Sequence, residues 1–183
     1  RVPAHGMLLL VGEARGPHLR FSEALPPQAI DCGADMAAQS THKILGAMTQ
    51  ASMLLVNGPR VDRERVREAA SLLQSTSPNQ LLRASLDIAR LQMAENGRET
   101  VGRAVRLAGR LRSAINAIDG LWSFGPEYTC YPGATGLDAT KITVQITGLG
   151  LSGVEAEAIL RHENKVQCEL SDARNVLFLV TYA

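Results

Sequence analysis

The segment QSTHKILGAMTQASMLLV, residues 39–56, sets the architecture of this chain. It ends in a short apolar run, ASMLLV, closed by the turn NGP, which is typical of a buried strand. Two similar runs come before it, MLLLVG at residues 7–12 and ADMAAQS at residues 34–40, the second of which ends shortly before Lys43. Short apolar strands separated by brief crossings predict the edge of an α/β sheet.

Lys43 lies just beyond the strand expected over residues 34–40, at the edge where open α/β sheets place their binding crevice. Ser40, Thr41 and His42 precede it, and all three side chains can hydrogen-bond a phosphate group. A lysine in a partly desolvated pocket has a lowered pKa, and its neutral amine can attack a carbonyl carbon to form a Schiff base. Two interpretations remain: a reactive amine beside a phosphate, as in pyridoxal phosphate chemistry, or a solvated lysine at a strand end.

The middle of the chain is predicted to be helical. One helix is expected over residues 62–73. A second begins at the capping-box pattern SPNQ of residues 77–80, with Ser77 as N-cap, and ends at Asn96 and Gly97. A third covers residues 99–118 and directs one apolar face inward: Ala104, Leu107, Leu111, Ile115 and Ile118.

Charge and composition limit the classes of partner. The formal net charge is +1 and 45% of the residues are hydrophobic, which predicts a packed core and gives no basis for bulk binding to nucleic acid or to a membrane surface. An arginine row at Arg103, Arg106 and Arg110 is better explained as a solvated helix face than as a nucleic-acid site. No apolar run reaches the length of a membrane span.

The three cysteines, Cys32, Cys130 and Cys168, are widely spaced and form no C-x-x-C pair. They predict reduced, buried thiols in a cytoplasmic protein, and neither a disulfide framework nor a metal site is expected.

The last third of the chain predicts a second, smaller α/β unit. A stretch rich in Gly, Pro and aromatic residues, 121–138, indicates a domain junction. Beyond it, Gly148, Gly150 and Gly153 spell G-x-G-x-x-G between a predicted strand and a predicted helix, and Glu169 lies 21 residues after Gly148 (169 − 148). This could be a dinucleotide fingerprint, but a single following hairpin offers no parallel sheet, and Ser152 is a plausible N-cap for an ordinary helix.

The segment GADMAAQSTHKILGAMTQASMLLV resembles the lysine segment of the bacterial-type ornithine/lysine/arginine decarboxylases, which are fold-type I pyridoxal phosphate enzymes. Two further stretches are similar to patterns of that family: LLLVGEARGPHLRFSEALP to LLVDEAHGAHxxF, and LLQSTSPNQLLRASLDIAR to QTTSPSYxLxASLDxAR. The resemblance implies an α/β fold in which residues 1–119 form part of the cofactor-binding large domain and residues 120–183 the start of a small α/β domain. It also implies that the chain is a fragment of such an enzyme.

The resemblance further implies roles for individual residues. Lys43 would form the Schiff base with pyridoxal phosphate, and Ser40 and His42 would contact the cofactor phosphate. Ser75, Thr76 and Ser77 would reach the phosphate of a neighbouring subunit's cofactor. A homo-oligomer, or assembly with a partner chain, and a small basic amino acid as substrate are therefore expected.

Three positions depart from the family pattern, and one of them is Leu55, which stands where the pattern has a His after S-M-L. Gly12 stands where the pattern has the Asp that keeps the pyridine nitrogen protonated, and Arg15 stands where it has His. Glu13 is adjacent to Gly12, but consecutive strand residues point to opposite faces, so Glu13 could take over only through a bulge. Three functions remain open: a basic amino-acid decarboxylase, a catalytically degenerate homologue that acts as a structural or interaction subunit, and a nucleotide-binding unit.

Overall fold

The computed structural model describes residues 6–182, which divide into two compact units. Of the described residues, unit 1 contains 6–23 and 27–98, and unit 2 contains 24–26 and 99–182. The division falls about twenty residues before the expected domain boundary at 119/120. Because a packing unit need not coincide with a domain, that boundary stays a prediction.

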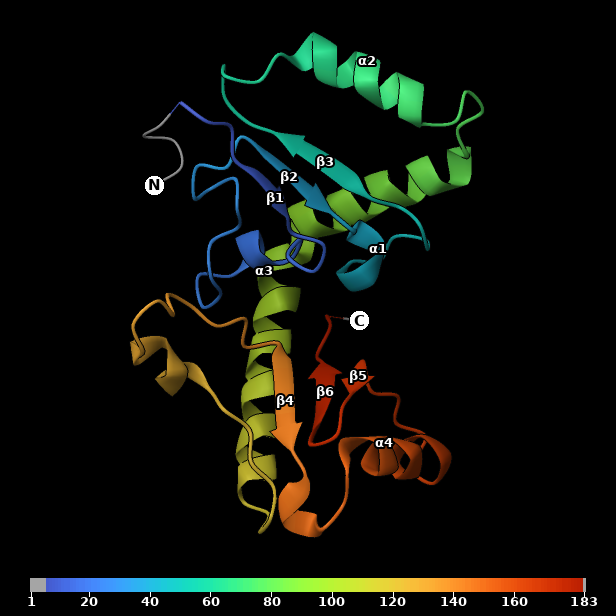
Figure 1. Cartoon of the computed structure of the whole chain (residues 1–183). Coiled ribbons are helices and arrows are strands. Elements are labelled where there is room, and N and C mark those ends of the chain that lie inside the picture. Colours follow the sequence, from blue (N-terminus) through green and yellow to red (C-terminus); the bar gives the residue numbers. More distant parts are fainter. Residues whose placement is uncertain (1–5, 183) are drawn as a thin grey trace. The chain divides into compact units, whose positions relative to one another are not determined.

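Unit 1 is built on a three-stranded sheet of order β1-β2-β3 (Figure 1). Strand β1 (Leu10–Gly12) runs parallel to β2 (Met36–Gln39), and β2 pairs antiparallel with β3 (Met53–Val56). The three strands expected from the sequence are therefore confirmed, although each is shorter than its apolar run. One face of the sheet buries Ala37 and Gln39, and the other leaves Leu10 and Leu54 at least half exposed.

Three helical segments belong to unit 1 alone: the 3-10 turn η2 (Leu19–Phe21), the single turn α1 (Thr41–Ile44) and α2 (Arg63–Leu73). Helix α2 begins where expected, because the Asp62 carboxylate accepts hydrogen bonds from the backbone N–H groups of Glu64 and Arg65.

The second and third predicted helices are one continuous helix, α3 (Gln80–Asn116). Its N-cap is Asn79 rather than Ser77, because the Asn79 amide oxygen accepts from the N–H groups of Leu81 and Leu82. The stop predicted at Gly97 is wrong. A side chain there would collide with the Phe21 ring, 2.7 Å away, so this glycine serves close packing inside the helix.

The inward face of the C-terminal half of α3 also differs from the prediction. Leu107, Leu111 and Ile118 are 39–51% exposed. Ala104 and Ile115 are buried as predicted, and the other buried positions of this half are Val101, Ala108 and Arg112.

Arg112 explains part of this shift in the buried face. Its guanidinium donates hydrogen bonds to the backbone carbonyls of Phe124, Ala139 and Lys141. A charged side chain can be buried when its donors are satisfied in this way, and no hydrophobic periodicity reveals it.

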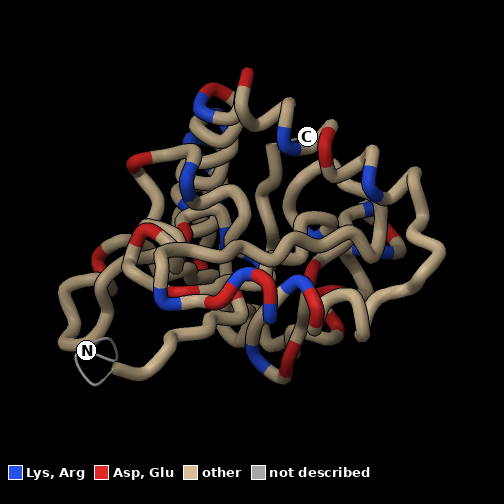
Figure 2. The backbone as a smooth tube through the Cα atoms, turned by 90° about the horizontal axis from the view of Figure 1, so that it is seen from above, with Lys and Arg blue, Asp and Glu red and all other residues tan. Residues whose placement is uncertain are grey.

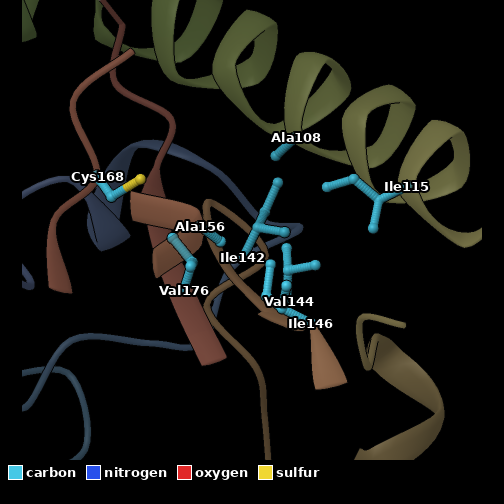
Figure 3. Packing of buried hydrophobic residues seen from close by; sticks show 8 residues of the cluster. All are labelled: Ala108, Ile115, Ile142, Val144, Ile146, Ala156, Cys168 and Val176. Atoms are coloured by element: carbon cyan, nitrogen blue, oxygen red, sulfur yellow. The ribbon is translucent and has the colours of Figure 1, made fainter. Parts of the chain in front are cut away.

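Unit 2 continues from α3 through the 3-10 turn η3 (Pro126–Cys130) into an antiparallel sheet of order β4-β6-β5. Its strands are β4 (Lys141–Gln145), β5 (Leu170–Ser171) and β6 (Asn175–Leu179), and between β4 and β5 lie η4 (Thr147–Leu149) and α4 (Gly153–His162). Figure 3 shows its core, in which side chains of β4 face Ala108 and Ile115 of α3. The core residues are Ala108, Ile115, Ile142, Val144, Ile146, Ala156, Cys168 and Val176.

Figure 2 shows basic and acidic residues interspersed along the backbone. Within residues 6–182, no helix is long and apolar enough to cross a membrane. All three cysteines are free, but the expectation that all are buried is wrong: Cys32 and Cys130 are exposed, and only Cys168 is buried. Burial raises the pKa of the Cys168 thiol.

Candidate functional site

The predicted lysine segment forms the turn that follows β2. The chain leaves the strand at Gln39, and Ser40 occupies the N-cap position of α1, whose residues include His42 and Lys43. Ser40 also accepts, through its backbone carbonyl, a hydrogen bond from the N–H of Lys43. Ser40, His42 and Lys43 therefore lie within one tight turn at one end of β2.

The Lys43 amine is exposed and has no hydrogen bond or ion pair with any other described residue. The chain contains only three lysines, and the other two are engaged: Lys141 pairs with Asp138, and the Lys165 Nζ donates to the carbonyl of His162. Lys43 is therefore the side-chain amine of this chain that is most available to a carbonyl compound.

The ring of His42 is held by the loop that follows α1. Its Nδ1 accepts a hydrogen bond of 3.2 Å from the backbone N–H of Gln50. Gln50 has a left-handed backbone conformation, with a φ of 77°, and the His42 backbone N–H donates to Ala51. Because Nδ1 is an acceptor, a neutral His42 carries its proton on Nε2, which leaves that N–H available as a donor.

The same loop is anchored to α3. The backbone N–H of Met48 donates to the hydroxyl of Ser85, a buried residue of the helix. Neither Gln50 nor Ser85 was predicted as part of the site. Gln50 contributes only its backbone N–H, so its side-chain type could not have indicated this contact. Ser85 looks in the sequence like any other serine of a helix.

Thr41, between Ser40 and His42, is only 1% exposed, and its hydroxyl has no hydrogen-bond partner among residues 6–182. It borders a cavity of ≈ 300 Å³ that lies within unit 1. An unpaired buried hydroxyl is uncommon in folded proteins, and the Thr41 hydroxyl is such a group.

Gly12 lies at the end of β1, paired with Ala38 of β2. It is exposed, and a Cβ added to it would meet nothing within 4 Å. The position therefore offers neither charge nor steric obstruction to an acidic side chain. Arg15, the second departure from the family pattern, is half-buried.

Glu13 does not replace the missing acid. The pairing of β1 with β2 runs without a bulge up to Gly12, and the next backbone N–H, that of Glu13, donates to Ala38. The Glu13 side chain therefore lies on the face opposite to that of Gly12. Both carboxylate oxygens are occupied, one by the N–H of Ala29 at 2.8 Å and the other by the amide of Gln39 at 2.7 Å. Glu13 thus fastens the loop at Ala29 to β2. Residues 29–33 of this loop form turns.

Ser75, Thr76 and Ser77 lie in the exposed connection between α2 and α3. The Ser75 hydroxyl accepts a hydrogen bond of 3.1 Å from the N–H of Ser77. No hydrogen bond within the described part of the chain links these three residues to the turn at Ser40 and Lys43. Their predicted role, toward the cofactor of another subunit, remains a prediction.

The glycine-rich turn of unit 2 has a structural explanation. Gly148 packs against the backbone of Gly120, and a Cβ at Gly153 would lie 2.1 Å from the carbonyl oxygen of Asn175. Ser152 caps α4 through a capping box with Glu155, as its position suggested. Since β4, β5 and β6 form an antiparallel sheet, the described residues of unit 2 contain no parallel crossover of the kind a dinucleotide site needs, and the nucleotide-binding alternative has no support.

The residues of this site suit the aldehyde and phosphate groups of pyridoxal phosphate, the cofactor implied by the resemblance, but not its pyridine nitrogen. A free amine at Lys43 and two neighbouring polar side chains at Ser40 and His42 suit an aldehyde and a phosphate. Nothing acidic stands at Gly12 to hold a pyridine nitrogen.

Comparison with known proteins places the chain in a family. The model of the Orn/Lys/Arg decarboxylase major domain matches residues 2–130. Arginine decarboxylases of Halalkalibacterium halodurans and of Bacillus subtilis are 44% and 39% identical over 174 and 173 residues, which is 95% and 94% of this chain. The chain spans only 35% of the length of each of these relatives.

Solved structures show the same fold. The crystal structure of the Francisella novicida lysine decarboxylase LdcF superposes on 95% of this chain with a TM-score of 0.81 at 22% identity, and 30% of that structure is covered. Mouse CSAD superposes on 98% of this chain with a TM-score of 0.63 at 17% identity, with 43% of that structure covered. The α/β fold is thus that of part of a fold-type I decarboxylase, as expected. This chain belongs to the Orn/Lys/Arg decarboxylase family.

Proposed function

We propose that this chain forms the lysine-bearing part of the cofactor site of a pyridoxal phosphate-dependent decarboxylase that acts on a basic amino acid. The observation that carries the proposal is the turn after β2, which sets the free amine of Lys43 beside Ser40 and an oriented His42 ring. Arginine is the first substrate to test, because the relatives with 39–44% identity are arginine decarboxylases.

Each residue would act through an atom that the structure leaves available. The Lys43 Nζ would hold the cofactor, while the Ser40 hydroxyl and the Nε2–H of His42 would donate hydrogen bonds to its phosphate. Pyridoxal phosphate, when bound, supplies a ring that accepts the electron pair left by departing carbon dioxide. Gly12 offers no acid to keep that ring protonated, and Glu13 is occupied elsewhere. We therefore expect the chain alone to have little decarboxylase activity.

Covalent labelling tests the assignment of Lys43. The chain is incubated with excess pyridoxal phosphate and reduced with borohydride, and its peptides are mapped by mass. We expect the label on Lys43 and its loss in Lys43→Arg, with Lys165→Arg as the matched control that keeps it. A label on Lys141 or Lys165, or on no lysine, would contradict the assignment.

The role of Gly12 is tested by adding the acid. Gly12→Asp should raise carbon dioxide release from arginine, on the order of a hundredfold, because one well-placed charged group is typically worth that much to a transition state. The open space at this position allows the substitution without displacement of neighbours. Robust turnover by the unmodified chain would show that another group already does this work.

A second candidate function rests on Gly12 as well. A chain that keeps the fold but lacks the acid could serve as a non-catalytic structural or interaction subunit. For such a subunit, Gly12→Asp should release no carbon dioxide from arginine, whether or not the chain binds pyridoxal phosphate.

Assembly with a second copy or a partner chain is part of the proposal. The connection that carries Ser75, Thr76 and Ser77 is preceded by Leu72 and Leu73, which are 87% and 88% exposed. Adjacent, nearly fully exposed leucines favour an interface at this end of α2. Light scattering should show a species larger than a monomer at micromolar concentration, and Leu72→Glu should shift it toward the monomer. The free thiols agree with a cytoplasmic location, which is also proposed.

A further inference from the structure

The buried hydroxyl of Ser85, on α3, begins a series of hydrogen bonds that ends at the His42 ring. The hydroxyl donates at 2.8 Å to the carbonyl of Leu82, in the preceding turn of the helix. Because its proton is directed into the helix, its oxygen serves as the acceptor for the N–H of Met48, at 3.1 Å. The Met48 side chain is 52% exposed, so this backbone contact, and not burial of the side chain, fastens Met48 to the helix.

The loop carries this anchor on to Gln50. The carbonyl of Met48 accepts a hydrogen bond of 3.0 Å from the N–H of Ala51, which closes a turn with Gln50 at its third position. Gln50 has a φ of 77°, a left-handed conformation that is unfavourable for a residue with an ordinary side chain. Such a conformation persists only where the surrounding contacts hold it. The contact with Ser85 holds the turn at its first residue, and the bond from the His42 N–H to the Ala51 carbonyl holds it at its last.

The left-handed conformation of Gln50 determines the state of the His42 ring. It directs the Gln50 N–H to Nδ1 of His42, at 3.2 Å. A ring nitrogen that accepts a hydrogen bond carries no proton, so the neutral ring is protonated at Nε2.

We infer that Ser85 is a positioning residue of the candidate site: it holds the loop of residues 48–51 in the conformation that fixes the tautomer of His42. Ser85 acts through the backbone of this loop and touches neither His42 nor the position of a cofactor. That the Nε2–H of His42 then donates to a cofactor phosphate rests on the proposed function, whereas the tautomer does not.

The tautomer is measured on the chain without cofactor, by nitrogen NMR of labelled histidine. The spectra are recorded at alkaline pH, where the ring signals no longer change with pH, and the signal of His42 among the four histidines is the one missing from His42→Gln. The unmodified chain should show a proton on Nε2. In Ser85→Ala the fraction with the proton on Nδ1 should rise by roughly threefold to tenfold, the factor that one hydrogen bond contributes.

Two further variants separate the hydroxyl of Ser85 from a general effect on helix stability. Ser85→Thr keeps the hydroxyl and should keep the Nε2–H tautomer. Ser71→Ala removes a serine hydroxyl of α2 that likewise donates to a carbonyl of its own helix, that of Arg67, and should leave the tautomer unchanged.

Amide hydrogen exchange tests the anchor in the unmodified chain, so the result does not depend on the folding of a variant. The amides of Met48 and Gln50 belong to exposed residues but should be protected, because each donates a hydrogen bond. In Ser85→Ala the Gln50 amide should exchange roughly threefold to tenfold faster.

Binding of pyridoxal phosphate and of pyridoxal, followed by visible absorbance, tests the link to the proposed function. Ser85→Ala should weaken binding of pyridoxal phosphate by roughly threefold to tenfold and leave that of pyridoxal, which has no phosphate, unchanged. A changed tautomer with unchanged affinity for pyridoxal phosphate would support the positioning by Ser85 and contradict the phosphate contact of His42. The inference itself is overturned if Ser85→Ala keeps the Nε2–H tautomer, if Ser85→Thr behaves as Ser85→Ala does, or if the Met48 amide of the unmodified chain exchanges as fast as in an unfolded peptide.

Discussion

Units 1 and 2 are stabilised by different kinds of contact. Unit 2 buries branched apolar side chains, with Ile142, Val144 and Val176 at 0–2% exposure (Figure 3). In unit 1 the fully buried apolar residues are mostly alanines, and buried polar residues lie among them: His18, Gln28, Asp35, Gln39, Thr41 and Ser85. Unit 1 therefore buries more polar side chains than unit 2, in which Arg112, Ser123 and Thr140 are the buried polar residues and branched apolar side chains fill the core.

The largest effect should come from breaking the core of unit 2. Ile142→Ala removes a side chain that is 0% exposed, and the cavity left behind should lower the free energy of unfolding by about 2–5 kcal/mol. Urea unfolding followed by the fluorescence of Trp122, the only tryptophan and a residue of unit 2, measures it. Val154→Ala, at a position 57% exposed, is the control and should cost far less.

A smaller loss is expected when the one buried guanidinium named in unit 2 is removed. Arg112→Met keeps a long apolar stem but leaves the carbonyls of Phe124, Ala139 and Lys141 without their donor. Unsatisfied buried groups cost about 1–3 kcal/mol, so the same fluorescence-detected unfolding should shift accordingly. Arg110→Met, on the exposed side of α3, should not shift it. Equal stability of the two variants would mean that water satisfies these carbonyls.

Unit 1 should respond to pH through Asp35, which accepts a hydrogen bond from the Leu9 N–H and pairs with Arg60. The hydrogen bond from Leu9, with a contribution from Arg60, holds the pKa of Asp35 below its ordinary value. A carboxyl whose folded pKa is lowered stabilises the fold above its unfolded pKa of about 3.9, and this contribution is lost as the pH falls through the folded pKa. Because the Arg60 side chain is 36% exposed, we expect a moderate effect.

Hydrogen exchange of the β2 amides measures this pH dependence. Protection in the unmodified chain should decline below about pH 4, whereas Asp35→Asn should be less protected near neutrality and lose the decline. An unchanged pH profile in Asp35→Asn would assign the titration to another carboxyl.

The smallest effect is expected at the capping box of α4. Ser152→Ala removes the hydroxyl that accepts from the Glu155 N–H, and loss of an N-cap typically costs about 1 kcal/mol. The unfolding midpoint of unit 2 should fall slightly, and Ser152→Asp should restore it. A loss as large as that of Ile142→Ala would mean that the turn at Gly148 and Gly153 carries a role beyond capping.

Much of the fold could be predicted from local patterns. The three strands of unit 1, the start of α2 and the cap of α4 depend on short-range rules: apolar runs, Asp62 and Ser152. The continuous helix α3 could not be predicted, because its passage through Gly97 depends on the Phe21 ring, 76 positions earlier in the sequence (97 − 21). The burial of Arg112 depends likewise on distant carbonyls.

The candidate site divides in the same way. Ser40, His42 and Lys43 were predicted from one continuous segment, and they lie in one turn of the structure, while their role stays a prediction. The occupation of Glu13 by Ala29 and Gln39, the backbone contact from Gln50 and the unpaired hydroxyl of Thr41 are tertiary features. Residue spacing in the sequence does not predict these contacts, so they could be found only in the folded chain.

The arrangement around Glu13 has a consequence for how such a site can evolve. An acid at Gly12 can be introduced by substitution at that position alone, because the space is open and the backbone is unstrained. Glu13 cannot be recruited in its place, since release of its carboxylate would remove the hydrogen bond to Ala29 that holds the loop and would leave the buried amide of Gln39 with only its long bond of 3.4 Å to Gln28. Natural variation among close relatives should therefore switch between Gly and Asp at this position while Glu13 stays constant.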